Sequence, residues 1–181
     1  NDAFNSACVT GVNGPNCPEG SGPDFDFGSS VILAKTPSRR DLLLAGQKSG
    51  MIYALDPDRK GELVWQTRVG KGGVIGGVQW GMASDGQSLY AATSDAIFVQ
   101  KNGVRSLDSA AGGGLTALRL EDGAKSWYVP PVACTSAPGC SPAQSAAVTA
   151  IPGVVFSGSM DGHLRAYSSE DGKVLWDFNT V

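Results

Sequence analysis

The chain has 181 residues and a net charge of −3, from 14 lysines and arginines against 17 aspartates and glutamates. Apolar residues make up 41% of the chain, charged residues 17%, and 25 residues are glycine. This balance excludes a nucleic-acid binder that neutralises phosphates and a chain disordered throughout, and no apolar run approaches the ~18 residues that a membrane-spanning helix needs. Abundant glycine between many short apolar runs indicates an all-β protein with tight turns.

Two local pairs of cysteines lie in segments rich in Gly, Pro, Ser and Asn, on either side of a long middle without cysteine. Their even number and closeness predict the disulfides Cys8–Cys17 and Cys134–Cys140. Such bonds would place the protein in an oxidising compartment such as the periplasm. A zinc site built from all four cysteines and a set of four reduced thiols are the alternatives.

Short runs of alternating apolar residues predict three sets of strands along the chain. The expected strands are 29–35, 41–45, 51–55 and 63–65 in the first set, 78–83 and 88–93 followed by a hairpin within 113–127 in the second, and 146–151, 153–157, 163–167 and 174–176 in the third. Asp122-Gly123 and Asp171-Gly172 predict hairpin turns, because glycine adopts positive φ without steric cost.

The last two strands of each set share a repeat of Ala, Gly and Trp. The three copies are Ala54, Gly61 and Trp65; Ala117, Gly123 and Trp127; and Ala166, Gly172 and Trp176. The last two copies have identical spacing, and about 49 residues separate their tryptophans. A repeat of four short strands at this length is typical of a propeller blade, with the small Ala allowing close packing and the Trp filling the gap between blades. A β-sandwich with coincidental Trp spacing is the alternative.

We therefore divide the chain into four parts. Residues 1–28 are expected to be a disulfide-stapled loop leading into the first strand, 29–70 a blade, 71–131 a blade with an insertion at 96–111, and 132–181 a blade preceded by a disulfide loop. Closed propellers contain about 4–8 blades, so a chain with about three to four is expected to be a fragment of a larger propeller. The remainder of that propeller is then its expected partner.

Three further segments lie in one order along the chain: GPDFDFG at 22–28, QKSG at 47–50 and GGVQWG at 76–81. Together with the Ala-Gly-Trp hairpins, they resemble the quinoprotein alcohol dehydrogenases, which depend on pyrroloquinoline quinone (PQQ). Among these, the chain looks most like the polyvinyl-alcohol dehydrogenases. It departs from the family at Gln79, where the family has Asn.

The resemblance assigns a role to residues in each segment. Asp26 matches the catalytic base and a calcium ligand, although Asp24 would share its face in a regular strand and remains the rival. Lys48 matches a catalytic donor that also contacts the cofactor and stabilises negative charge on the reduced quinone. Gln79 and Trp80 match residues that bind the cofactor.

The resemblance implies a periplasmic or secreted enzyme that uses PQQ and Ca²⁺ to oxidise a secondary or polymeric alcohol and passes the electrons to cytochrome c. The alternative is a periplasmic protein-binding scaffold without a cofactor, since quinoprotein-like propellers also serve in outer-membrane protein assembly. A propeller that has lost its cofactor is a third possibility, which the Gln79 departure leaves open.

Overall fold

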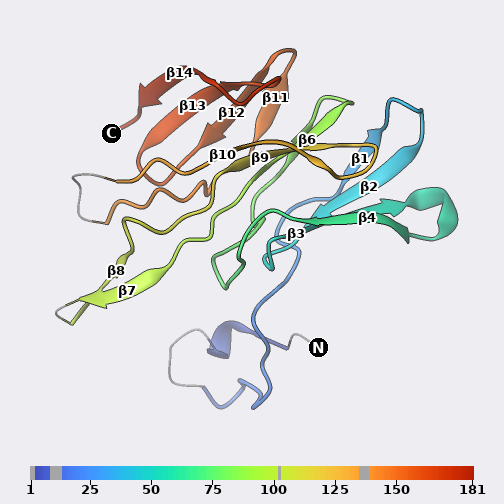
Figure 1. The fold of residues 1–181 in the computed structure, drawn as a ribbon. Coiled ribbons are helices and arrows are strands. Elements are labelled where there is room, and N and C mark those ends of the chain that lie inside the picture. The colour runs from blue at the N-terminus through green and yellow to red at the C-terminus, as the bar shows by residue number, and fades with distance from the viewer. Residues whose placement is uncertain (1–2, 9–13, 102, 135–138) are drawn as a thin grey trace.

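The computed structural model describes residues 3–8, 14–101, 103–134 and 139–181. Within these ranges the protein is all-β apart from two short 3-10 turns, Ser6–Cys8 and Pro57–Arg59. The chain forms three four-stranded antiparallel sheets and one separate hairpin (Figure 1). We call the sheets blade 1, blade 2 and blade 3 in chain order.

Each blade is a meander whose strands follow one another in space. Blade 1 comprises β1 (Ile32–Lys35), β2 (Asp41–Gly46), β3 (Met51–Asp56) and β4 (Glu62–Arg68). Blade 2 comprises β5 (Ala83–Ser84), β6 (Ser88–Ala92), β9 (Leu115–Arg119) and β10 (Lys125–Val129). Blade 3 comprises β11 (Thr149–Ile151), β12 (Val154–Gly158), β13 (His163–Ser168) and β14 (Val174–Asn179).

The first strand of each blade is shorter than the sequence predicts. The prediction of a strand over 78–83 is wrong except at its last residue, because β5 covers only Ala83–Ser84. The backbone before β5 bonds to neighbouring blades instead: the Val78 N–H donates to the Gln47 carbonyl of blade 1, and the Gly81 carbonyl accepts from the Val148 N–H before β11. The segment between 76 and 82 therefore connects blades rather than extending a sheet.

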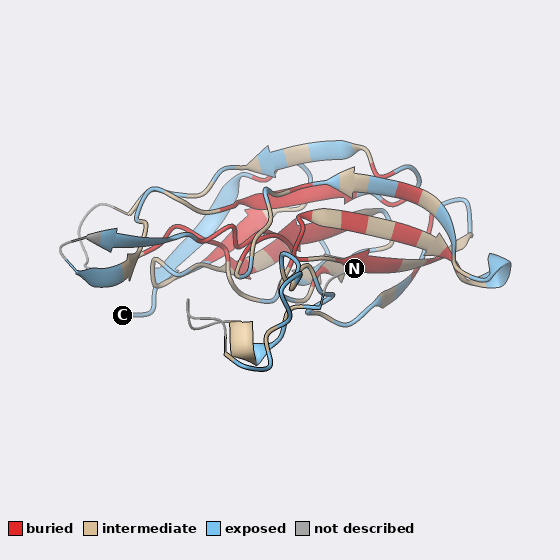
Figure 2. Ribbon diagram, turned by 90° about the horizontal axis from the view of Figure 1, so that it is seen from below, coloured by how far each residue is buried: buried red, intermediate tan, exposed pale blue. Residues whose placement is uncertain are grey.

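The hydrophobic core lies between the sheets (Figure 2), and the two middle strands of blade 2, β6 and β9, carry core residues on both faces. Because side chains alternate along a strand, Leu89 and Ala91 of β6 face blade 1, whereas Tyr90 and Ala92 face blade 3. The same alternation on β9 sends Leu118 to the first cluster and Ala117 to the second. Each blade therefore needs a neighbour to bury its apolar face.

Tryptophans join one blade to the next at equivalent positions. The Trp65 indole N–H donates to the Leu120 carbonyl at 2.9 Å, and a Cβ on Gly123 would lie 2.5 Å from the Trp65 ring. Trp127 repeats this contact on blade 3, where its N–H donates to the Ser169 carbonyl at 3.0 Å and its ring packs on Gly172. Gly123 and Gly172 both have positive φ, as the turns predict. The Ala-Gly-Trp repeat is thus an interblade contact.

The connection between β6 and β9 departs from the meander. The insertion in blade 2 folds as a separate hairpin of β7 (Phe98–Lys101) and β8 (Val104–Leu107). It projects from the sheets toward the end of the molecule where the N-terminal segment lies (Figure 1). The predicted disulfides Cys8–Cys17 and Cys134–Cys140 are both present. Among the described residues, no helix has the length and apolar character needed to cross a membrane.

Candidate active site

The buried Lys48 pairs with both the candidate base, Asp26, and its rival, Asp24. The Lys48 Nζ lies 3.0 Å from Asp24 Oδ2 and 3.0 Å from Asp26 Oδ1. The Lys48 and Asp24 side chains are 11% and 14% exposed, whereas Asp26 is 62% exposed. The structure therefore brings both aspartates to one ammonium group but leaves only Asp26 open to solvent and ligands.

The charge of Lys48 is held in place by its partners. Burial by itself would lower the pKa of this amine, but hydrogen bonds and charge from Asp26 and Asp24 outweigh burial and raise it. Lys48 is therefore an ammonium at neutral pH. It has three N–H bonds, of which two serve the aspartates, and the third pairs with no other residue in the part of the chain that the structure describes.

The Lys48 side chain is presented by a tight turn between β2 and β3. The Gly50 N–H donates to the Gln47 carbonyl at 2.9 Å, and Gly50 has φ +82°. The glycine-rich segment 70–77 packs directly on this turn: the Gly73 N–H donates to the Lys48 carbonyl, and a Cβ on Gly77 would lie 2.2 Å from that oxygen. Only glycine permits this approach of two backbones.

A residue that the sequence analysis did not single out fixes the glycine-rich segment. Asp95 is buried, has φ +44°, and accepts hydrogen bonds from the N–H groups of Lys71 at 2.8 Å, Gly72 at 3.0 Å and Gly77 at 2.7 Å. Hydrogen bonds to a charged acceptor are stronger than neutral ones. Asp95, which follows β6 of blade 2, thereby fixes a loop against the turn of blade 1.

Gln79 and Trp80 lie at the entry to blade 2, beside blade 1. The Gln79 carbonyl lies 2.9 Å from the position of a Cβ on Gly28, two residues after Asp26, so the two entry segments touch. Trp80 is 44% exposed, and its indole N–H donates to Ser145 Oγ of the blade 3 entry at 2.7 Å. The structure thus places Asp26, Lys48, Gln79 and Trp80 on adjoining entry segments and turns.

One backbone hydrogen bond recurs in all three blades at this end. The donors stand two residues after the second strand of each blade, and the acceptors stand in the entry segment of the same blade. The pairs are Lys48 N–H to the Asp26 carbonyl, Ser94 N–H to the Gly77 carbonyl, and Met160 N–H to the Ala143 carbonyl. Asp26, Gly77 and Ala143 are therefore equivalent positions, and so are Gln79 and Ser145, two residues further on.

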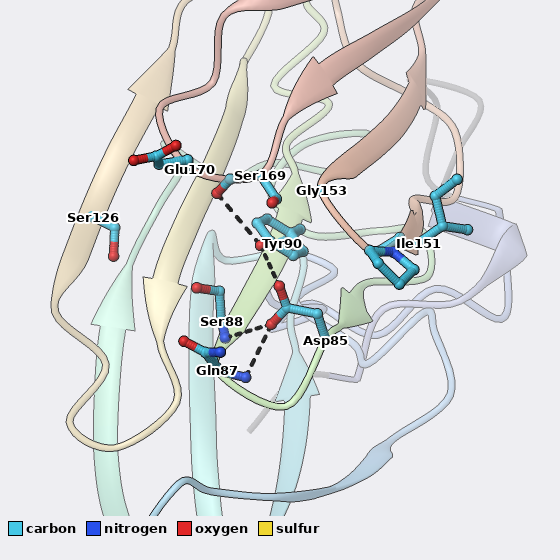
Figure 3. A pocket seen from close by; sticks show the side chains of 11 residues that line it. Asp85, Gln87, Ser88, Tyr90, Ser126, Ile151, Gly153, Ser169 and Glu170 are labelled. Atoms are coloured by element: carbon cyan, nitrogen blue, oxygen red, sulfur yellow. Dashed lines mark hydrogen bonds between the residues drawn. The ribbon is translucent and has the colours of Figure 1, made fainter.

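A sizeable cavity lies away from these residues. It has a volume of about 620 Å³, opens between blades 2 and 3, and is lined by the turns before β6 and β12 (Figure 3). Its Asp85 carboxylate accepts from the Gln87 and Ser88 N–H groups and from the Tyr90 hydroxyl. Burial and Asp85 raise the pKa of Tyr90 to about 12, so the phenol stays protonated at neutral pH and donates to Asp85.

Comparison with known proteins identifies the family. A family model described as outer membrane protein assembly factor BamB matches residues 28–180. The chain belongs to this family of quinoprotein-like β-propellers. A europium-containing methanol dehydrogenase shares the fold with a TM-score of 0.61 and 18% identity, over 87% of this chain and 36% of that one. The predicted propeller class is thus confirmed.

Closer sequence similarity is found to two dehydrogenases. The chain is 49% identical over 169 residues to a polyvinylalcohol dehydrogenase of Pseudomonas sp., covering 92% of this chain and 25% of the relative. It is 39% identical over 169 residues to a polyvinylalcohol dehydrogenase of Sphingopyxis sp. strain 113P3, covering 91% and 25%. The chain spans about a quarter of the length of these relatives.

Proposed function

We propose that this chain is the part of a PQQ-dependent alcohol dehydrogenase that carries the catalytic base and the cofactor-binding lysine, with a secondary or polymeric alcohol as substrate. The observation that supports this most is the pairing of the buried Lys48 ammonium with the exposed Asp26 carboxylate. The similarity to two polyvinylalcohol dehydrogenases points to the same activity.

The described residues fit the quinone. Among them, Lys48 keeps one donor for a quinone oxygen, and Trp80 offers an exposed ring whose orientation is fixed by Ser145. The Gln79 side-chain amide has both donor and acceptor atoms and suits a cofactor carboxylate. When bound, PQQ would accept the two electrons of the alcohol.

The described residues do not by themselves form a calcium site. Ca²⁺ takes 6–8 oxygen ligands, and no group of three or more potential metal ligands occurs in the described part of the chain. Both aspartates near the site are also bound to Lys48. Asp26 would be one ligand of an ion held mainly by other residues, and we assign calcium no step.

In this proposal Asp26 and Lys48 have different roles in the reaction. Asp26, being exposed, takes the hydroxyl proton of the alcohol as general base. Lys48 donates a hydrogen bond and stabilises negative charge that develops on the acceptor oxygen. Asp24 is a positioning residue, since it is buried and holds the other side of the same ammonium. Electrons would leave to cytochrome c, and the protein would act in the periplasm or outside the cell.

The test is alcohol-dependent dye reduction by the full-length protein with PQQ and Ca²⁺, comparing wild type with D26N. General bases contribute about 10²–10⁴-fold, so D26N should lose at least ~100-fold in kcat. The matched control is D41N, which removes another lysine-paired carboxylate, on the surface of blade 1, and should keep full activity. Unchanged activity in D26N would overturn the assigned base.

The second candidate is a protein-binding scaffold, which the description of the matching family favours. A scaffold needs no cofactor, and the pairing of Lys48 with Asp24 and Asp26 would then only stabilise blade 1. In that case the wild-type protein would show no alcohol-dependent dye reduction and no change in tryptophan fluorescence on addition of PQQ.

A further inference from the structure

A second cavity lies between blade 1 and blade 2. Its volume is about 320 Å³, at the lower end of the roughly 300–1,000 Å³ found for ligand pockets. The end of β4, the loop at 69–71, the glycines before β9 and the strand β10 line it. Arg68 links it to the active-site turn, because its guanidinium donates to the Ser49 carbonyl at 2.7 Å.

The walls of this groove carry three cations, Arg68, Lys71 and Lys125. None of them pairs with a carboxylate among the residues that the structure describes. Such pairing is common elsewhere, since seven other lysines and arginines form ion pairs with described residues. The described lining of the groove therefore holds three cations against one carboxylate, Asp95, and is net positive in a chain whose net charge is −3.

The hydrogen-bonding groups of the groove are also mostly donors. Its one described carboxylate, Asp95, already accepts three backbone N–H bonds. Thr93 donates its hydroxyl to the Gly114 carbonyl. Burial, aided by the charge of Asp95, raises the pKa of Tyr128, so this half-exposed phenol keeps its proton and remains a donor. A ligand in the groove thus meets ammonium, guanidinium and phenol donors.

We infer that this groove binds a small free polyanion whose charges are carboxylate or phosphate groups. An anion with two or more charged groups matches three cations in one cavity, and charge-assisted hydrogen bonds to oxyanions are roughly twice as strong as neutral ones. A guanidinium and two ammonium groups can engage either oxyanion. The site is separate from the proposed PQQ contacts and does not depend on the proposed dehydrogenase activity.

The test is isothermal titration calorimetry of the full-length protein without PQQ, with citrate as the carboxylate probe and inorganic pyrophosphate as the phosphate probe. Saturable binding of at least one probe is expected, and K71Q/K125Q should weaken it at least tenfold. The tighter probe identifies the chemical group. The binding should also weaken as NaCl is raised, because exposed charges are screened.

The matched control is R39Q/K60Q, which removes two exposed cations that line neither described cavity and pair with no described carboxylate. This variant should bind the probes like wild type. Equal weakening in both double variants would show a net-charge effect and overturn the site, as would absence of binding in wild type or unchanged affinity in K71Q/K125Q. Because Lys71 and Lys125 are exposed, unchanged urea midpoints should confirm that both variants fold.

Discussion

Blade 1 and blade 3 use the same turn between their second and third strands, but they use it differently. In both turns a glycine with φ above +80° closes a hydrogen bond to the carbonyl three residues earlier, Gly50 to Gln47 and Gly162 to Ser159. The second turn residue is Lys48 in blade 1, which is buried, and Met160 in blade 3, which is 41% exposed.

The difference lies in what surrounds each turn. In blade 1 the entry segment supplies Asp26 where blade 3 has Ala143, so only the blade 1 turn has a carboxylate for its second residue. In blade 3 the third turn residue, Asp161, pairs instead with the buried Arg165, which also binds Asp177. One repeated scaffold thus carries a charged centre open to ligands in blade 1 and a closed ion-pair network in blade 3.

The largest effect is expected from breaking the blade 3 network with R165M. The Arg165 and Asp161 side chains are only 5% and 9% exposed, so removing the guanidinium leaves a buried carboxylate without its cationic partner. Loss of one partner of a buried pair costs about 3–5 kcal/mol of unfolding free energy, measurable by urea denaturation. The control R119M removes an exposed partner of Asp122 and should change stability little; equal losses in the two variants would contradict the network.

A methyl group on the turn glycines should distinguish the two turns. Both G50A and G162A place alanine at positive φ, which costs about 1 kcal/mol or more. At Gly50 the added Cβ would also lie 2.4 Å from the Gly70 carbonyl oxygen, whereas at Gly162 it meets the Val181 side chain at 2.7 Å. We expect G50A to lose about 3 kcal/mol and G162A about 1 kcal/mol in urea denaturation. A larger loss in G162A would show that the glycine-rich segment does not constrain the blade 1 turn.

The stabilising effects of Asp161 in blade 3 and of Lys48 in blade 1 should be lost at opposite ends of the pH scale. Burial opposes ionisation of Asp161, but hydrogen bonds, led by that from Arg165, outweigh it and lower its pKa, so its stabilising effect is lost as the pH falls through the folded pKa. The pKa of Lys48 is raised, so its effect is present below its unfolded pKa and lost as the pH rises through the folded value.

This difference can be tested by measuring the free energy of unfolding of wild type, R165M and K48M across pH. The loss of unfolding free energy in R165M relative to wild type should become smaller below about pH 4. The corresponding loss in K48M should become smaller above about pH 11. Deficits that do not change with pH would mean that packing, not charge, stabilises the two turns.

The repeats predicted the fold because the same local physics recurs three times. The Gly-Trp spacing identified the interblade contact of Trp127 with Gly172, and the segment around Asp26 and Lys48 identified two residues that the structure joins. The start of blade 2 was predicted as a strand because its apolar residues alternate, but its backbone bonds to other blades.

Other residues of the site could not be found from the sequence. Asp95 acts through long-range contacts with backbone N–H groups 18 to 24 residues earlier, which no local pattern encodes. Ser145 contacts Trp80, which lies 65 residues earlier in the chain. Only the backbone hydrogen bond that recurs in the three blades reveals that Ser145 is equivalent to Gln79. Likewise, the sequence could not choose between Asp24 and Asp26, because only the folded chain shows which one is exposed.

The smallest effect is expected from copying the blade 1 residue into blade 3. M160K places a lysine on the equivalent turn, but Ala143 offers it no carboxylate side chain, and the position is exposed. Stability should therefore change by no more than about 0.5 kcal/mol in urea denaturation. A clear gain in stability would show that the turn alone, without Asp26, is enough to hold an ammonium group.

The most direct measurement of the central claim is the affinity of the full-length protein for PQQ, followed by tryptophan fluorescence, in K48M and M160K. Both variants alter the same turn position, and circular dichroism should first confirm that both fold. We predict at least tenfold weaker binding for K48M, because a charge-assisted hydrogen bond is lost, and wild-type affinity for M160K. Wild-type affinity in K48M would contradict the assignment of Lys48 as a cofactor-binding residue.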